Sequence, residues 1–204
     1  DAMEELSKFA IKHNIPVTQT VMGYSTMKRD HTHYAGQIGA LGGKNTNSLA
    51  KQTDLAIAVG TKLADFTTGS WTNFENENFK LVSINVSRFD ANKHLAQAVV
   101  GDARASLNEL STALGDWKAP EEWNKKSQIE LKAWNEHVDK ESAPTNQEVP
   151  SYVQVVGAVY RNSDPSDIAV TAAGGLVGEV IQVWRPRELN THETEWGFSC
   201  MSYE

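Results

Sequence analysis

Cysteine, long apolar runs and clusters of basic residues are all scarce in this sequence. Its one cysteine, Cys200, cannot form an internal disulfide, which fits a reducing compartment, and we expect a cytoplasmic protein. No apolar run approaches the roughly 20 residues that cross a bilayer, so no transmembrane helix is expected. The net charge is -7 and Lys and Arg are not clustered, which argues against a nucleic-acid partner, because phosphate binding needs concentrated positive charge.

What the chain does contain is the composition of an ordinary globular protein, with 40% hydrophobic and 22% charged residues. Its 204 residues suffice for one large domain, or for a domain and part of another, because domains commonly contain about 100 to 150 residues. The chain begins at Asp1 within a helical pattern and stops after "CMSYE" without a capping signal. We therefore expect a piece of a longer protein.

Helices and strands are expected to alternate in residues 1–115. Apolar residues at 2–13 have helical spacing, and the runs "IPVTQT" (15–20), "DLAIAVG" (54–60) and "KLVSINV" (80–86) are typical of buried strands. A helix in "DARASLNELSTAL" closes this part of the chain. The alternation predicts the α/β class, with a doubly wound, Rossmann-like parallel sheet in which these three strands are central neighbours.

The stretch between the first two of these strands is rich in glycine and polar residues, and only residues 46–52 indicate a helix there. Residues 116–149 are expected to form a connector, with a charged helix at 121–139 and a polar linker after it. From 150 to 204 the pattern predicts the beginning of a second α/β domain, which we expect to be incomplete. A helix just after Pro150 and a strand in "DIAVTAAGG" support this interpretation.

Three motifs could carry chemistry, and simple structural interpretations compete with each of them. His31 and His33 could bind a metal, but no further ligands stand at a recognisable spacing, so a polar loop is favoured. Cys200 could be a nucleophile, yet no base accompanies it, and a packed thiol is commoner. The run "AVGTKLADFTTGS" (58–70) follows a buried strand, at the crevice where doubly wound sheets bind nucleotides, but no G-x-G-x-x-G motif occurs, which leaves nucleotide binding open.

Several separated motifs resemble one enzyme family. The run from "ELSKFAIKHNIPVTQT" through "TDLAIAVGTKLADFTTGS" and "KLVSINVSRFDANKH" to "VVGDARASLNEL" resembles the central domain of thiamine-diphosphate enzymes of the acetolactate-synthase type. "TAAGGLVGE" and "ETEWGFSCMSYE" resemble the opening of the domain that binds the cofactor's pyrophosphate in this family. "TTGS", "INVSRFD" and "GFSCMSYE" are most similar to the family's cyclic-dione hydrolases of myo-inositol breakdown.

The resemblance implies a three-domain parent enzyme that forms homodimers or tetramers, with thiamine diphosphate and Mg²⁺ bound between subunits. In such enzymes the glutamate that activates the cofactor belongs to the first domain, and the magnesium ligands follow the segment that ends here at Glu204. No catalytic or metal-binding residue is therefore expected within this chain. The expected substrate is a small cyclic dione, whose C–C bond the parent would hydrolyse to 5-deoxy-glucuronate, whereas the 204 residues alone would be inactive.

The resemblance also assigns two groups of residues to the cofactor. A turn of small residues is expected at its diphosphate, and a segment near the chain end at its aminopyrimidine: Ala173, Gly174, Gly175 and Leu176 for the first, and Ser199, Cys200 and Met201 for the second. Two glycines after a strand expose backbone N–H groups, and a following helix would direct its N-terminal dipole at a phosphate. An ordinary tight turn is the alternative.

Flavin-containing relatives usually carry arginines after the strand at 54–60, where Lys62 and Phe66 stand here, so a flavin is not expected. Two other functions stay open. One is an acetolactate-synthase-like carboligase or decarboxylase, which acts on pyruvate-sized substrates. The other is a non-catalytic nucleotide-binding or interaction module. Finally, such domains normally open with a strand before the first helix, so residues 1–115 are expected to lack their first strand and to expose sheet edges.

Overall fold

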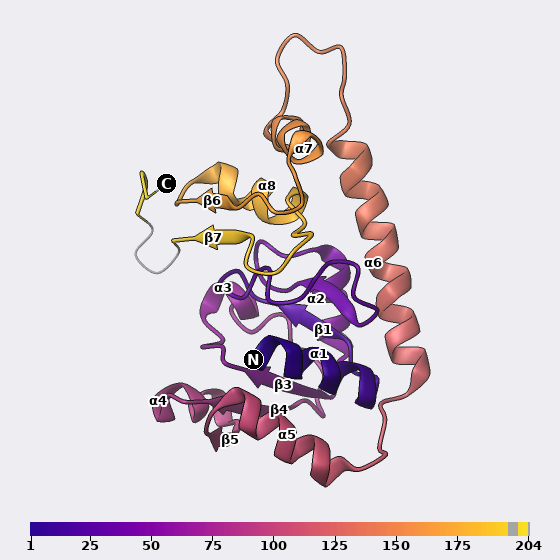
Figure 1. Cartoon of the computed structure of the whole chain (residues 1–204), viewed down its shortest axis with the longest axis vertical. Coiled ribbons are helices and arrows are strands. Elements are labelled where there is room, and N and C mark those ends of the chain that lie inside the picture. Colours follow the sequence, from indigo (N-terminus) through magenta and orange to yellow (C-terminus); the bar gives the residue numbers. More distant parts are fainter. Residues whose placement is uncertain (196–199, 204) are drawn as a thin grey trace.

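The computed structural model describes residues 1–195 and 200–203, in which helices alternate with parallel strands (Figure 1). The helices are α1 (Ala2–His13), α2 (Lys44–Gln52), α3 (Asp65–Thr68), α4 (Arg88–Ala91), α5 (Ala103–Leu114), α6 (Glu121–Glu141), α7 (Tyr152–Asn162) and α8 (Gly175–Val183), with a 3-10 helix at Lys93–Leu95. The strands are β1 (Val17–Gln19), β2 (Tyr34–Gln37), β3 (Leu55–Val59), β4 (Lys80–Asn85), β5 (Gln97–Val100), β6 (Ala169–Thr171) and β7 (His192–Thr194). In this part of the chain no helix is both long and apolar enough to cross a membrane.

The strands form three small sheets in which every described pair is parallel. β1 pairs with β2, β3 pairs with β4 and β4 with β5, and β6 pairs with β7. Helices flank these sheets, because parallel neighbours need a connection that returns over a sheet face. The α/β class predicted from the sequence is confirmed, as are the helices α1, α5, α6 and α7 and the pairing of β3 with β4.

Three strands, β2, β5 and β7, are missed by the sequence patterns, and one predicted neighbourhood is wrong. β2 lies in the glycine-rich stretch for which only a helix is predicted, and β7 lies near the chain end. β1 pairs with β2 and shares no ladder with β3 among the described residues, so "IPVTQT" is not the direct neighbour of "DLAIAVG". β2 has no alternating pattern because all four of its residues are buried. Its Gly36 has φ 99°, and a Cβ there would lie 2.6 Å from the hydroxyl oxygen of Thr46.

For description, residues 1–115 are called the central unit, and residues 150–195 with 200–203 the second unit. In the central unit, α1 and α5 lie side by side and pack on the β3–β4–β5 sheet around buried Phe9, Ile84 and Leu107. Asp1 caps the amino end of α1 with a side chain that accepts a backbone N–H of the first turn, and Asn14 caps its carboxyl end in the left-handed conformation. These local signals set the two ends of the helix, and the packing of Phe9 holds it over the sheet.

Helix α6 runs along one side of the molecule and packs against both units (Figure 1). In its middle, Leu131 is buried with Met27 and Tyr34 of the central unit. Nearer its end, Val138 is buried with Tyr160 and Trp184 of the second unit. The charged connector predicted from the sequence is therefore part of both hydrophobic cores.

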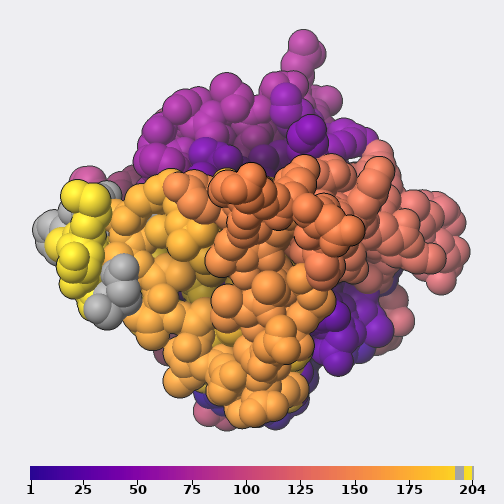
Figure 2. Space-filling model, turned by 90° about the horizontal axis from the view of Figure 1, so that it is seen from above, coloured from indigo at the N-terminus to yellow at the C-terminus, as the bar shows by residue number. Residues whose placement is uncertain are grey.

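The second unit packs directly against the central unit. Figure 2 shows its orange and yellow atoms against the indigo and magenta ones. Val21 of the central unit is buried with Val177 and Ile181 of α8. The hydroxyl oxygen of Tyr24 lies 2.8 Å from the carbonyl oxygens of both Ile181 and Trp184, so a central-unit side chain donates to the end of α8.

The buried isoleucine of β4 gives a test of this core. Ile84→Ala is expected to lower the free energy of unfolding by about 2–5 kcal/mol, because the side chain is only 1% exposed and its loss leaves a cavity. Ile129→Ala on α6, where the side chain is 70% exposed, is the matched control and should change it by less than about 0.5 kcal/mol. Urea denaturation measures both, and equal effects at the two positions would contradict this placement of the core.

Candidate functional site

The turn between β6 and α8 is built from small residues and is open to solvent. β6 ends at Thr171 and α8 begins at Gly175. Gly174 precedes the helix with φ 142°, a conformation that favours glycine. A Cβ added at Gly174 or at Gly175 would meet no other atom within 4 Å. The glycines are therefore not required by close packing, and a ligand can approach the backbone here.

The amino end of α8 leaves its first N–H groups available. No side chain caps it, and its first turn contains no acidic residue. The first N–H groups of a helix have no partner inside the helix, and the helix dipole makes this end attractive to anions. A phosphate-sized anion thus fits the chemistry of this turn.

Two buried hydroxyls lie at the carboxyl ends of the adjacent strands. Thr171 of β6 stands opposite Thr194 of β7 in the ladder. Neither hydroxyl has a hydrogen-bond partner among the described residues, although Thr194 is only 4% exposed. Buried polar atoms are normally paired, so these two are a second sign that this edge is built for a polar ligand.

His192, at the start of β7, is held in its neutral form. Burial lowers its pKa to about 4, and its ring meets that of Tyr24 edge-on at 5.0 Å between centroids. Its Nε2 has no partner in the described part of the chain. The ring therefore contributes packing between the two units without adding positive charge near the turn.

The parallel pairing brings both groups of predicted site residues to the same edge. Ala173 to Leu176 follow β6, whereas Cys200 and Met201 follow β7, and both strands end on that side (Figure 1). The backbone N–H of Cys200 donates to Glu195 Oε2 at 2.8 Å. Cys200 is exposed, so the interpretation as a packed thiol is wrong. Ser199 lies outside the described residues.

The histidine pair forms no metal centre with its described neighbours. His33 is buried, and its ring nitrogens lie 3.2 Å from Asn14 Oδ1 and 3.0 Å from the Thr32 hydroxyl. His31 Nδ1 accepts the backbone N–H of His33. Within residues 1–195 and 200–203, no group of three or more His, Cys, Asp or Glu side chains could hold a metal ion. The pair stabilises the loop before β2.

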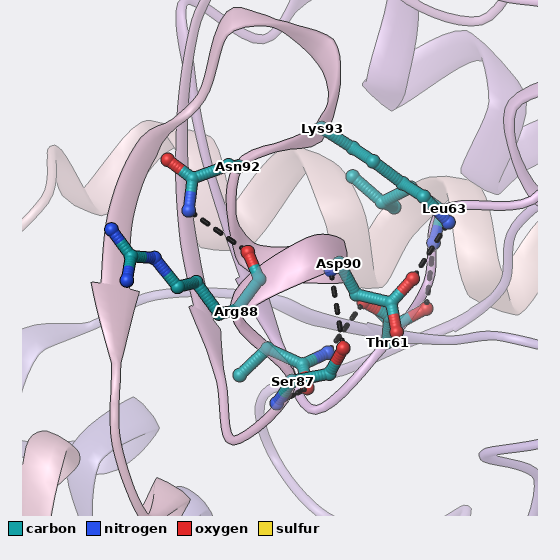
Figure 3. A network of polar contacts seen from close by, with 8 residues as sticks. Thr61, Leu63, Ser87, Arg88, Asp90, Asn92 and Lys93 are labelled. Atoms are coloured by element: carbon teal, nitrogen blue, oxygen red, sulfur yellow. Dashed lines mark hydrogen bonds and ion pairs between the residues drawn. The ribbon is translucent and has the colours of Figure 1, made fainter.

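The carboxyl edge of the β3–β4–β5 sheet is the second region that could bind a ligand, and Figure 3 shows its polar network. The Ser87 hydroxyl accepts the backbone N–H of Asp90, and the Lys93 ammonium pairs with the Asp90 carboxylate at 2.6 Å. The hydrogen bond from Lys93 lowers the pKa of Asp90. The Thr61 hydroxyl accepts the N–H of Leu63 on the facing loop. These groups satisfy one another, so the Asp90–Lys93 pair is a structural feature of the edge.

Residues with strained backbone conformations are concentrated along this same edge. Five residues other than glycine adopt left-handed conformations there: Leu63, Ser70, Trp71, His94 and Leu95. Each such conformation costs on the order of 1 kcal/mol or more and is commonest at functional sites. Lys62 and Phe66, the residues discussed for flavin, are exposed here. The strained backbone makes this edge a second candidate region for ligand binding, although no sequence motif indicates one there.

One internal cavity lies between the units, lined among others by Gln37, Arg29 and Arg185. Its volume is about 20 Å³, enough for one water molecule and too small for a diphosphate. The Gln37 amide is buried there without a partner among the described residues. The turn after β6 is therefore the better candidate for an organic cofactor.

The first 110 residues match the family described as "Thiamine pyrophosphate enzyme, central domain". The chain belongs to this family. Over its whole length it is 35% identical to a 3D-(3,5/4)-trihydroxycyclohexane-1,2-dione hydrolase of Geobacillus thermodenitrificans, 33% to one of Clostridium tetani and 32% to one of Bacillus anthracis. The chain spans 35% of the length of each of these relatives.

The family match ends within α5, far before the turn after β6. The hydrolase relatives, by contrast, align with 100% of the chain and so include that turn. The open backbone at Gly174 and Gly175, the uncapped helix and the buried hydroxyls of Thr171 and Thr194 suit the anionic end of the family's cofactor.

The low pKa of His192 makes stability depend on pH. Its folded value of about 4 lies below the roughly 6.5 of an unfolded chain, so the unfolded state binds the proton first as the pH falls. The contribution of neutral His192 to the free energy of unfolding is complete above pH 6.5 and is lost as the pH falls from 6.5 to 4. Between pH 7 and 4.5 the unfolding free energy of the protein should fall by about 2 kcal/mol more than that of His192→Gln. Parallel pH profiles of the two proteins in urea denaturation would contradict this burial.

Proposed function

We propose that this chain is part of a thiamine-diphosphate-dependent hydrolase that opens trihydroxycyclohexane-1,2-dione to 5-deoxy-glucuronate in myo-inositol catabolism. The observation that carries the proposal is the alignment of the whole chain, at 32–35% identity, with relatives named as this hydrolase. The parent enzyme is proposed to be a cytoplasmic homodimer or tetramer. Its Mg²⁺ ligands and its activating glutamate are assigned to other parts of the longer polypeptide.

The residues of this chain would bind and orient the cofactor. The backbone of Ala173, Gly174, Gly175 and Leu176 is proposed to hold its diphosphate, because these N–H groups lie at the open, uncapped end of α8. The segment at Ser199, Cys200 and Met201 is proposed to meet its aminopyrimidine, since it leaves the same sheet edge. Bound thiamine diphosphate supplies the carbon nucleophile and electron sink that permit C–C cleavage.

The central unit is proposed to serve as a scaffold without flavin. Lys62 and Phe66 stand where flavin-binding relatives usually carry arginines. The carboxylate of Asp90 and the ammonium of Lys93, at the same edge, are already engaged with each other. The unit would then act through its contacts with α6 and α8, which fix the second unit in place.

The choice of substrate tests the proposed function. With thiamine diphosphate and Mg²⁺, the full-length parent protein should convert trihydroxycyclohexane-1,2-dione to 5-deoxy-glucuronate, as followed by mass spectrometry. It should not convert pyruvate to acetolactate at a comparable rate. The 204-residue chain alone should turn over neither substrate. Acetolactate formation without dione turnover would favour the carboligase instead, and the absence of both would favour a non-catalytic module.

The diphosphate contact is tested at the second glycine of the turn. Gly175→Val in the full-length protein should raise the thiamine diphosphate concentration for half-maximal activity at least about tenfold, about 1.4 kcal/mol, because the side chain would occupy the open backbone. Gly175→Ala should have a smaller effect. Gly178→Ala, one turn along α8, is the matched control, since its Cβ would meet only Leu41 Cδ2 at 3.5 Å.

Circular dichroism should show the same fold in all three variants. A cofactor requirement that is unchanged in Gly175→Val would reduce the two glycines to an ordinary turn. A requirement raised equally by Gly178→Ala would indicate a general disturbance of α8 rather than a lost contact with the diphosphate.

A further inference from the structure

The internal cavity between the two units holds buried polar groups that no described residue satisfies. Gln37 of β2 is only 5% exposed, and neither its amide nitrogen nor its amide oxygen has a hydrogen-bond partner among the described residues. The Nε of Arg185, just after α8, is also buried and unpartnered in this part of the chain. Both side chains line the cavity. Because buried polar atoms are normally paired, these two side chains indicate an occupant.

The size of the cavity limits what the occupant can be. Its volume of about 20 Å³ holds one water molecule, and a chloride ion is only slightly larger than water. Phosphate, sulfate and carboxylates contain several heavy atoms and need more space. The choice therefore lies between a water molecule and a monatomic ion.

The charge around the cavity favours an anion. Arg29 and Arg185 line it, and its described lining contains no Asp or Glu. These two guanidiniums and that of Arg187 lie 4.9 to 5.9 Å from the centroid of the Tyr160 ring. Among the described residues, only Asp139 forms an ion pair with a member of this cluster, Arg185. Three positive charges thus meet one negative charge, which excludes a cation and leaves an anion to balance the excess.

Other groups of the lining suit an anion as well. Trp134 of α6 contributes an indole N–H, a group that can donate but not accept. Burial raises the pKa of Tyr34 on β2 above its usual value, and the charges of Arg185 and Arg29 act on this pKa in the opposite direction. The positive charge of both arginines therefore reaches the buried lining of the cavity.

We propose that a chloride ion occupies this cavity, bound by the amide N–H of Gln37 and the Nε–H of Arg185. A buried charge is costly unless it is paired, so an anion suits the arginines better than a neutral water molecule does. The ion would join three elements, because Gln37 belongs to β2, Trp134 to α6, and Arg185 follows the carboxyl end of α8. It would stabilise the junction that holds α8 against the central unit.

Diffraction from crystals of the full-length parent protein grown in sodium chloride tests the occupant directly. At long X-ray wavelengths chlorine scatters anomalously, whereas the oxygen of a water molecule hardly does. An anomalous peak is expected in the cavity, at hydrogen-bonding distance from Gln37 Nε2 and Arg185 Nε. Crystals grown in sodium gluconate, whose anion is too large to enter, should show no peak. A cavity without an anomalous signal in the chloride crystals would overturn the proposal, whether it is empty or holds water.

Gln37→Glu separates an anion from water in solution. The variant places a carboxylate beside Arg185 with almost no change in size, so it should repel chloride and supply the missing negative charge itself. The unfolding temperature of the unchanged parent protein should rise by at least about 2 °C as chloride replaces gluconate at constant ionic strength, and should reach a plateau. That of Gln37→Glu should not depend on chloride. Gln97→Glu, on exposed residue 97 of the outer strand β5, is the matched control and should respond as the unchanged protein does.

A chloride-dependent rise that persists in Gln37→Glu would overturn the proposal, because chloride would then act on the protein in general. If that variant does not fold, the diffraction experiment on the unchanged protein still decides. None of these measurements follows the enzyme reaction, so their outcome is independent of the proposed hydrolase activity.

Discussion

Parallel strands impose one constraint on the whole molecule, because each must be followed by a chain segment that returns over a sheet face before the next strand can begin. All the segments that leave the carboxyl ends of one sheet therefore meet at one edge. In the central unit these are the loops of Thr61 and Ser87, and in the second unit they are the turn at Gly174 and the segment of Cys200. The candidate binding regions are consequences of this rule, since no single stretch of sequence contains either of them whole.

The same constraint explains how much could be predicted from the sequence. β3 and β4 are apolar runs within a helix–strand alternation, and a Ser151–Gln154 capping box that sequence rules recognise precedes α7. Such rules do not detect β2, because its burial comes from tertiary packing around Gly36 and not from a pattern in the sequence. The separation of β1 from β3 was equally hidden, because apolarity indicates a buried strand and does not name its neighbour.

At the candidate site, the pattern of small residues located the turn, and the resemblance supplied its expected ligand. The unpartnered hydroxyls of Thr171 and Thr194 could not be predicted, because whether a hydroxyl has a partner depends on what the fold brings near it. The left-handed backbone of Leu63 and His94 was unpredictable for a related reason, since it arises from how the loops of the central sheet are tied together. Both features lie where segments distant in sequence meet.

Helix α8 is a rigid element whose two ends lie in different surroundings. Its amino end forms the open turn at Gly175, and about 13 Å away its last carbonyls meet the buried hydroxyl of Tyr24, whose pKa burial raises well above its usual value. Because a helix is rigid, a contact that fixes one of its ends also fixes the position of the other end. The central unit thus sets the axial position of α8 through Tyr24 at its carboxyl end and through Val21, which packs against Val177 in its first turn, and substitutions around Tyr24 would shift the turn that is proposed to bind the cofactor.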